Sequence, residues 1–331
     1  MKRVFSIILG LVMVICVLSA CTDNTGDGNT GGGNTSDGLI RVGIINNPAS
    51  ESGYREANVK DFEEVFSREN GYETETFYSL NHNEQLNAAR QFIANGVDYL
   101  LISAASSDGW DSVLRSAKDA GINVFLFDRM INTSEDFYVA AVVSDMARQG
   151  DLAVRWLRNQ NLDSYNVVHI QGIMGSDAQI GRTSALDREF AAGTMRNVVQ
   201  QSAAWDEDEA KRIVEAVIAS GAELNVIYAE NDGMARGAVS ALAEAGISHG
   251  VDKDVIIIGF DANKWALREL LAGNWNYNGQ CSPFQASIID EMIKKLEAGG
   301  EITEKKVISD EKGFDARTIT QADIDTYGLG E

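Results

Sequence analysis

Strand-like and helix-like segments alternate along the chain from Leu39 onward, and this alternation restricts the fold more than any other feature of the sequence. Short runs rich in valine, isoleucine and aromatic residues are each followed by a longer segment with apolar residues at helical spacing. In residues 55–68, for example, Val59, Phe62 and Phe66 would share one face of a helix. Repeated strand–helix units require a parallel sheet with right-handed crossovers, so we predict an α/β protein.

The strand-like runs form two similar series, which predicts two similar Rossmann-like lobes, each a parallel sheet flanked by helices. The first series contains residues 40–45, 72–78, 99–102 and 124–127, and the second contains 139–143, 167–170, 198–201, 226–228 and 255–260. The predicted helices are residues 55–68, 84–95, 111–120, 147–159, 178–192, 207–220, 234–245, 265–272 and 284–298. Four glycines stand where a helix commonly ends in a C-cap glycine: Gly96, Gly121, Gly221 and Gly246.

The run INVFLFDRMI at residues 122–131 reads as a buried strand that ends abruptly in Asp128 and Arg129. Ligands of open α/β sheets bind just outside the carboxyl ends of the strands, where this pair stands. Aspartate accepts hydrogen bonds and arginine donates them in a fixed fork, which suits a ligand rich in hydroxyl groups. A surface ion pair in a loop explains the same two residues equally well.

Polar and aromatic residues also follow the other predicted strands. These loops contain residues 46–55, 103–110, 171–176, 204–206, 230–232 and 261–263. If the two sheet edges face each other, the loops form a cleft lined by carboxylates, amides, guanidinium groups and indoles. Such a mixture favours a sugar, because polar groups bind its hydroxyls and aromatic faces cover its C–H patches.

The composition excludes several classes of function. The net charge is −21, which argues against binding to nucleic acid or adsorption to an anionic membrane surface. Of the three cysteines, Cys16 and Cys21 lie at the N-terminal end, and Cys281 is left without a partner for a disulfide. The histidines His82, His169 and His249 are scattered singly, so we expect neither a metal site nor a cofactor.

Residues 1–20 open with Lys2 and Arg3 and continue with a short apolar run, as in a secretory signal peptide. The sequence Leu-Ser-Ala-Cys that ends at Cys21 resembles the lipobox of bacterial lipoproteins, which implies cleavage before Cys21 and acylation of its sulfur. An ordinary signal peptide with a chance cysteine is the alternative. Only Thr, Asp, Asn, Gly and Ser follow up to residue 38, so residues 21–38 are expected to be a disordered, lipid-anchored tether.

Five segments resemble the type I periplasmic sugar-binding proteins of the ribose-binding group, and most of all the galactofuranose-binding proteins. They are ESGYREAN at 51–58, the segment 96–129, VVHIQGIMGS at 167–176, the segment 226–246 and IIGFDA at 257–262. The resemblance implies a monomeric, non-enzymatic protein with two lobes that close on a monosaccharide and deliver it to an ABC permease. It also implies a three-segment hinge, with residues 39–144 and 282–308 in an N-terminal lobe and residues 145–281 and 309–331 in a C-terminal lobe.

The resemblance further implies the residues that contact the sugar: Glu51, Tyr54, Arg55, Trp110, Asp128, Arg129, Arg182, Trp205, Asn231, Asp261 and Gln280. We expect Asp232 to cap the following helix rather than to bind ligand. Two features depart from the family: Ala262 replaces a glycine, and the first loop is one residue longer. The longer loop leaves the identity of the sugar open.

Four other functions are possible on this scaffold. A dehydrogenase is unsupported because no G-x-G-x-x-G follows the first strand. A glycosidase would need two carboxylates at a set separation, and Glu51, Asp128 and Asp261 leave that possibility open at the sequence level. A lactose-repressor-type regulator would need a DNA-binding motif before residue 39, and none is present. A sensory protein that presents the sugar to a membrane kinase or chemoreceptor would use the same cleft.

Overall fold

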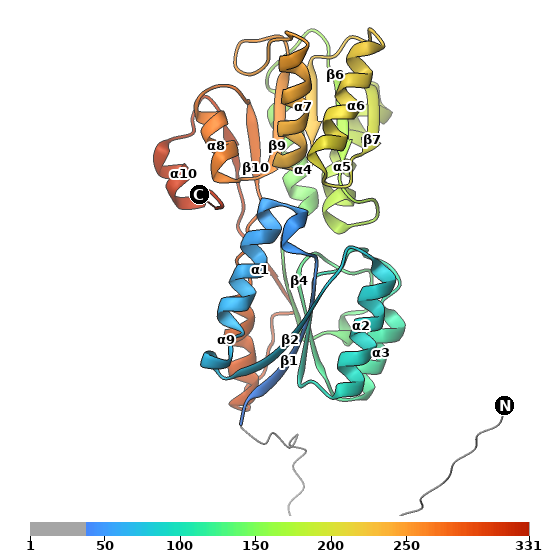
Figure 1. The fold of residues 1–331 in the computed structure, drawn as a ribbon, viewed down its shortest axis with the longest axis vertical. Coiled ribbons are helices and arrows are strands. Elements are labelled where there is room, and N and C mark those ends of the chain that lie inside the picture. Colours follow the sequence, from blue (N-terminus) through green and yellow to red (C-terminus); the bar gives the residue numbers. More distant parts are fainter. Residues whose placement is uncertain (1–37, 331) are drawn as a thin grey trace, which may run out of the picture. The chain divides into compact units, whose positions relative to one another are not determined.

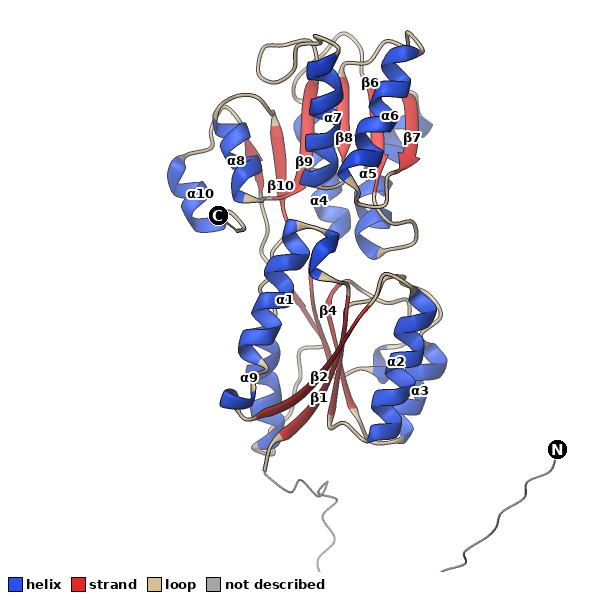
Figure 2. Cartoon of the chain, viewed as in Figure 1, coloured by secondary structure: helices blue, strands red, loops and turns tan. Residues whose placement is uncertain are grey.

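The structure is a computed structural model that describes residues 38–330. The predicted signal peptide, the predicted acylation site at Cys21 and all of the predicted tether but Gly38 lie outside the described residues. The described chain forms two six-stranded sheets, each with helices on both faces (Figures 1 and 2). This confirms the predicted fold class. No helix within residues 38–330 is long and apolar enough to span a membrane.

The N-terminal lobe is built on a sheet in which all neighbouring strands are parallel, in the order β11-β5-β4-β3-β1-β2. Its strands are β1 (Ile40–Asn46), β2 (Tyr72–Tyr78), β3 (Tyr99–Ile102), β4 (Asn123–Asp128), β5 (Ala140–Val143) and β11 (Lys306–Ile308). Its helices are α1 (Gly53–Val65), α2 (His82–Asn95), α3 (Asp111–Asp119) and α9 (Ala286–Glu297), with the short 3-10 turns Ala49–Glu51, Arg68–Asn70 and Glu135–Phe137.

Strand β4 shows why this sheet is covered on both faces. Phe125 and Phe127 belong to the apolar cluster that contains residues of α1 and α9. Val124 and Leu126 belong to the cluster that contains residues of α2 and α3. Successive side chains of a strand point to opposite faces, so a continuous apolar run requires a helical layer on each side. Figure 1 shows α1 and α9 on one side of the sheet and α2 and α3 on the other.

The C-terminal lobe repeats this plan with the order β12-β10-β9-β8-β6-β7, in which β12 alone runs antiparallel to its neighbour. Its strands are β6 (Asn166–Gln171), β7 (Arg196–Ser202), β8 (Val226–Ala229), β9 (Ile256–Asp261), β10 (Tyr277–Gln280) and β12 (Gly313–Asp315). Its helices are α4 (Met146–Arg158), α5 (Asp177–Ala192), α6 (Glu207–Ala219), α7 (Asp232–Glu244), α8 (Lys264–Leu271) and α10 (Gln321–Tyr327).

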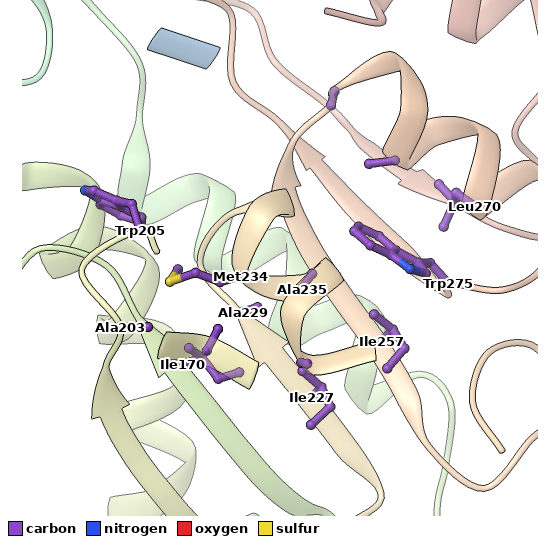
Figure 3. Packing of buried hydrophobic residues seen from close by; sticks show 14 of the residues in the cluster. Ile170, Ala203, Trp205, Ile227, Ala229, Met234, Ala235, Ile257, Leu270 and Trp275 are labelled. Atoms are coloured by element: carbon purple, nitrogen blue, oxygen red, sulfur yellow. The ribbon is translucent and has the colours of Figure 1, made fainter. Parts of the chain in front are cut away.

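One apolar cluster of the C-terminal lobe reaches the edge of its sheet where the site lies. Figure 3 shows Trp205 at one end of the cluster, near Met234, and Trp275 at the other. Ile170, Ile227 and Ile257 lie between them on neighbouring strands. The Trp205 side chain therefore packs against the core of the C-terminal lobe and lies at the margin of that core.

The chain passes between the two sheets three times. The crossings are the connections from β5 to α4, from β10 to α9 and from β11 to β12. The third crossing delivers one edge strand to each lobe. Both of these strands, together with β10 and α10, were missing from the elements predicted from the sequence.

Candidate functional site

The two sheets share one topology, and it places a site between them. In each sheet the first strand lies between the second and the third, so the chain changes direction between β1 and β3 and between β6 and β8. Ligands of such sheets bind outside the carboxyl ends of the strands near this switch point. A cavity between the lobes lies there, lined by Glu51, Ser52, Tyr54, Asp128, Arg129, Met146, Ala178, Arg182, Trp205, Asn231, Asp261 and Cys281.

The cavity is narrow because the lobes touch each other. The cavity has a volume of about 20 Å³. Across the lobes, Ser107 N donates to Gly175 O at 3.1 Å. Met130 N donates to Asp177 Oδ2 at 2.9 Å.

Asp128 is held in place by three hydrogen bonds from its own lobe. It ends β4, is 1% exposed, and accepts hydrogen bonds from Tyr54 Oη at 2.8 Å, Ser103 Oγ at 2.8 Å and Arg55 Nη2 at 2.5 Å. Burial alone would raise the pKa of Asp128, but the charges of Arg55 and Arg129 outweigh it and lower this pKa to about 2. The carboxylate is therefore ionised at neutral pH and fixed in orientation.

Glu51 lies beside Asp128, on the turn that precedes α1. Its carboxylate accepts from Arg55 Nε at 3.0 Å and from Asn47 Nδ2 at 2.8 Å. Burial raises the pKa of Glu51, but Arg129 and Arg55 more than offset this, so the pKa lies below its ordinary value. Two carboxylates thus line the N-terminal wall of the cavity in their charged form.

Two donors of the cavity have no partner. Arg129 Nη1 and Trp205 Nε1 are buried and make no hydrogen bond within the described residues, and Arg129 Nε has only an ion-pair contact with Asp128 Oδ2 at 3.3 Å. Arg129 is 4% exposed, and its Nη2 lies 3.4 Å from Glu51 Oε1. Buried polar atoms almost always have a partner, and an exception calls for an explanation such as a bound ligand. These two donors therefore mark where acceptor atoms of a ligand would lie.

The position of the Trp205 ring depends on Gly172. A Cβ on Gly172 would lie 1.9 to 2.1 Å from three atoms of the Trp205 ring, so only glycine leaves room for the indole. Arg129 Cζ lies 6.0 Å from the centre of the same ring, on the outer limit of a cation–π contact. The indole thus forms one wall of the cavity, with an arginine from the other lobe opposite.

Arg182 and Asp261 form the charged pair of the C-terminal lobe. Arg182 Nη2 lies 3.2 Å from Asp261 Oδ1, and Arg182 Nη1 donates to the backbone oxygen of Glu230. Burial raises the pKa of Asp261 above its ordinary value of 3.8, and Arg182 only partly opposes this. Glu51 and Asp128 raise it further from across the cavity.

Backbone strain is concentrated at this edge of the sheets. Most non-glycine residues with positive φ lie at strand ends beside the cavity: Asp128 (64°), Ala204 (52°), Trp205 (70°), Asp261 (102°) and Ala262 (64°). A side chain with a Cβ rarely adopts these angles, and such residues gather at binding and active sites. Ala262 occupies the position where the family has glycine, and it adopts the left-handed conformation despite its Cβ.

The prediction that Asp232 caps helix α7 is wrong. The cap is Asn231, whose side chain accepts from Met234 N at 2.8 Å. Asp232 instead accepts from Asn263 N at 2.8 Å and from Asn278 Nδ2 at 2.6 Å. Buried and close to Asp261, the Asp232 carboxyl has a pKa well above its ordinary value. The sequence could not separate these adjacent residues, because both are good caps.

Three of the eleven predicted contact residues do not line the cavity. Arg55 is fully buried behind Asp128. Trp110 lies in the core of the N-terminal lobe, where its Nε1 donates to Ser106 O at 2.9 Å. Gln280 accepts from Lys312 N at 3.4 Å, beside the third crossing. The remaining eight line the cavity: Glu51, Tyr54, Asp128, Arg129, Arg182, Trp205, Asn231 and Asp261.

Sequence reasoning missed four lining residues: Ser52, Met146, Ala178 and Cys281. Small and apolar residues at helix starts, and a single cysteine after a strand that was itself not predicted, give no sequence signal for a binding site. Cys281 is 2% exposed, and burial raises the pKa of its thiol. No group of three or more His, Cys, Asp or Glu side chains that could hold a metal ion occurs in residues 38–330.

Comparison with known proteins identifies the class of protein. A family model described as periplasmic binding protein domain matches residues 42–301, and the chain belongs to this family. The galactofuranose-binding protein YtfQ of Escherichia coli K12 is 30% identical over 231 residues, which are 68% of this chain and 72% of YtfQ. These similarities confirm the predicted resemblance to the type I sugar-binding proteins. Family membership also implies a location outside the cytoplasm.

Solved structures agree with this assignment. A Mycobacterium smegmatis protein in complex with β-D-fucofuranose is 28% identical, with a TM-score of 0.78 over 87% of this chain and 93% of that one. The binding protein of the arabinose ABC transporter from Shewanella sp. ANA-3, bound to L-arabinofuranose, is 25% identical, with a TM-score of 0.78 over 87% and 95%. The similar proteins bind and transport sugars and are not enzymes, so the chain is a binding protein.

Proposed function

We propose that this protein is the sugar-binding subunit of an ABC importer and that it captures one neutral monosaccharide between its lobes. The observation that carries this proposal is the pair of buried donors without partners, Arg129 Nη1 and Trp205 Nε1. Both lie at a cavity whose lining also contains three carboxylates, the amide of Asn231, the hydroxyl groups of Ser52 and Tyr54 and the guanidinium of Arg182. A sugar would supply oxygen acceptors to the two donors and hydroxyl donors to the carboxylates.

The charges around the cavity favour a neutral ligand. Three carboxylates line it, those of Glu51, Asp128 and Asp261. Three guanidinium groups oppose them: Arg129 and Arg182 at the cavity and Arg55 directly behind it. Neither a sugar acid nor an amine would find a surplus of opposite charge. We propose direct sugar contacts for the eight lining residues named above, with Trp205 stacking on the ring.

Our proposal for the ring form of the bound sugar rests on the similar proteins. YtfQ is named for galactofuranose, and the two solved structures contain fucofuranose and arabinofuranose. We therefore propose a galactose-like or arabinose-like sugar bound as the furanose.

The sequence supports two further parts of the proposal. Cys21, at the end of a lipobox-like segment, would carry the lipid that holds the protein at the membrane. The protein would deliver its sugar to the transmembrane subunits of the permease as a monomer. Metabolic labelling with a radioactive fatty acid, compared between wild type and Cys21→Ala, tests the anchor directly.

The sugar proposal is tested by thermal unfolding with D-galactose, L-arabinose, D-fucose, D-ribose or D-fructose, and with glycine and glutamate as non-sugar controls. A ligand present at about 100 times its Kd stabilises the folded state by about 2.7 kcal/mol, which gives a clear rise in Tm. We expect galactose or arabinose to give the largest rise and the amino acids to give none. A flat response to all five sugars would refute the proposal.

A further inference from the structure

Glu311 is a buried carboxylate at the crossings between the lobes and lies outside the cavity. It stands between β11 and β12 and is 3% exposed. Oε1 accepts from Ser144 Oγ at 2.6 Å and from Ser282 N at 2.7 Å, and Oε2 accepts from Gln149 Nε2 at 2.6 Å. Both oxygens of the carboxylate are therefore bonded to donors from other segments.

These donors come from different crossings. Ser144 lies between β5 and α4, Ser282 lies between β10 and α9, and Glu311 itself lies on the third crossing. One carboxylate thus ties together all three segments that join the lobes. In addition, Arg148 Nη1 donates to the backbone oxygen of Glu311 at 2.8 Å.

A chain of hydrogen bonds continues from Glu311 to the cavity. The amide of Gln149 donates to Glu311 and accepts from Arg182 Nε at 2.9 Å. Arg182 lines the cavity and bonds Asp261 there. All four side chains are buried, so water does not compete for these bonds.

Burying the ionisable carboxylate of Glu311 costs free energy. Burial raises the pKa of Glu311, although the bonds from Ser144, Ser282 and Gln149 and the charge of Arg182 oppose this. A carboxylate can accept all three hydrogen bonds at once. An amide of the same shape has one acceptor oxygen, so its NH2 group would face one of the three donor groups. The geometry thus depends on the carboxylate itself and not only on its volume.

We propose that Glu311 is a positioning residue that fixes the angle between the lobes and couples it, through Gln149, to the occupancy of Arg182. This inference rests on the proposed sugar binding, because the coupling has a function only if a ligand engages Arg182. The bonds to Ser144 and Ser282 would hold the lobes closed once a sugar is bound. Loss of the carboxylate should therefore speed release of the sugar rather than slow its capture.

The test compares wild type with Glu311→Gln, and uses the neighbouring exposed acid in Asp310→Asn as the matched control. Stopped-flow tryptophan fluorescence follows binding of D-galactose or L-arabinose, whichever raises the wild-type Tm more. We expect Glu311→Gln to raise the dissociation rate about tenfold, in line with the loss of a buried charged hydrogen bond, and to change the association rate less than about twofold. Asp310→Asn should match wild type.

Hydrogen exchange without sugar gives a readout that does not depend on the ligand. In Glu311→Gln, exchange should rise in residues 144–149 and 281–286, on the two crossings that Glu311 bonds, and not in the strands of either lobe. Unchanged exchange in both segments, or an even rise across both lobes, would overturn the proposal. An effect confined to the association rate would also overturn it. If none of the five sugars raises the wild-type Tm, the proposed function fails, while the exchange data still decide the role of Glu311 in the hinge.

Two further variants keep the test decisive. Gln149→Leu cuts the link to Arg182, so its effect on the dissociation rate should combine with that of Glu311→Gln less than additively, and full additivity would refute the link. If Glu311→Gln does not fold, Ser144→Ala removes one donor to the same carboxylate. It should show the same pattern with a smaller amplitude, and wild-type behaviour would refute the proposal.

Discussion

Arg55 and Asp128 form a buried ion pair, with Arg55 Nη2 only 2.5 Å from Asp128 Oδ2. Arg129 approaches the same oxygen at 3.3 Å with Nε, yet leaves Nη1 without a partner. Two arginines therefore share one carboxylate in different ways. Arg55 bonds the Asp128 carboxylate from the buried side, whereas Arg129 faces the cavity that a ligand would fill. The two residues should respond differently to mutation.

Replacing Arg55 by methionine should destabilise the protein by about 3–5 kcal/mol, because a buried carboxylate would lose its main partner. Chemical denaturation monitored by circular dichroism measures this change. The matched control is Arg212→Met, which breaks an exposed pair with Glu209 and should cost far less stability, because solvent screens such a pair. Equal losses in the two variants would contradict the role assigned to Arg55.

Replacing Arg129 by alanine should weaken sugar binding at least about tenfold, since a charged hydrogen bond to the ligand would be lost. The loss of folding stability should be smaller than for Arg55→Met, because Arg129 leaves a nitrogen unbonded in the protein. Calorimetric titration with galactose or arabinose measures the affinity. Arg115→Ala, on the exposed face of α3, serves as the control. Wild-type affinity in Arg129→Ala would remove this residue from the site.

Replacing Gly172 by alanine should weaken binding by displacing the Trp205 ring, which lies within 2.1 Å of the added methyl position. The effect should appear as a changed tryptophan emission and a lower affinity for the sugar. Gly233→Ala is the matched control, because the nearest atom to its added carbon is 3.7 Å away. In helix α7 that change should stabilise the protein by about 0.4–1 kcal/mol. An unaltered affinity in Gly172→Ala would argue against Trp205 as a wall of the site.

Stability should depend on pH through Asp261. Its pKa in the folded protein lies above the unfolded value because of burial, so the folded state holds a proton that the unfolded state releases. The wild-type free energy of unfolding therefore falls as pH rises between these two values. In Asp261→Asn this contribution is absent. The stability of the variant relative to wild type should rise from about pH 4 to about pH 7.

Urea unfolding at constant ionic strength measures this trend, with Asp208→Asn on the exposed start of α6 as the control. A relative stability of Asp261→Asn that falls over the same interval would show that Arg182 lowers the pKa more than burial raises it. The substitution also removes the ion pair with Arg182. This loss changes the free energy of unfolding by a constant amount and does not affect the trend with pH.

Much of the site could be predicted because its residues follow apolar strands. Asp128, Arg129 and Asp261 each stand at or directly after the carboxyl end of a buried strand, and strand ends are visible in the sequence. Trp110 lies further along the loop that follows β3, and its indole turns into the core and bonds Ser106. The direction of one side chain depends on packing between elements, and no local pattern encodes it.

The elements that were missed lack periodicity. Strand β10 has the sequence YNGQ, and β11 and β12 have three residues each. Their strand conformation comes from hydrogen bonds to an existing sheet rather than from their own residues. Glu311 was missed for the same reason, since a single acid in a polar loop carries no signal until its partners from distant segments are in place.

The third crossing also determines when the protein can finish folding during synthesis. Strand β11 completes the N-terminal sheet beside β5, although more than 160 residues separate the two strands in the chain. Strand β12 and helix α10 complete the other half only a few residues later. Neither half can therefore be whole while a ribosome still holds the last part of the chain. A nascent chain that ends before residue 306 lacks an edge strand in each sheet. The two exposed edges can pair with other chains and promote aggregation until chaperones or the final residues cover them.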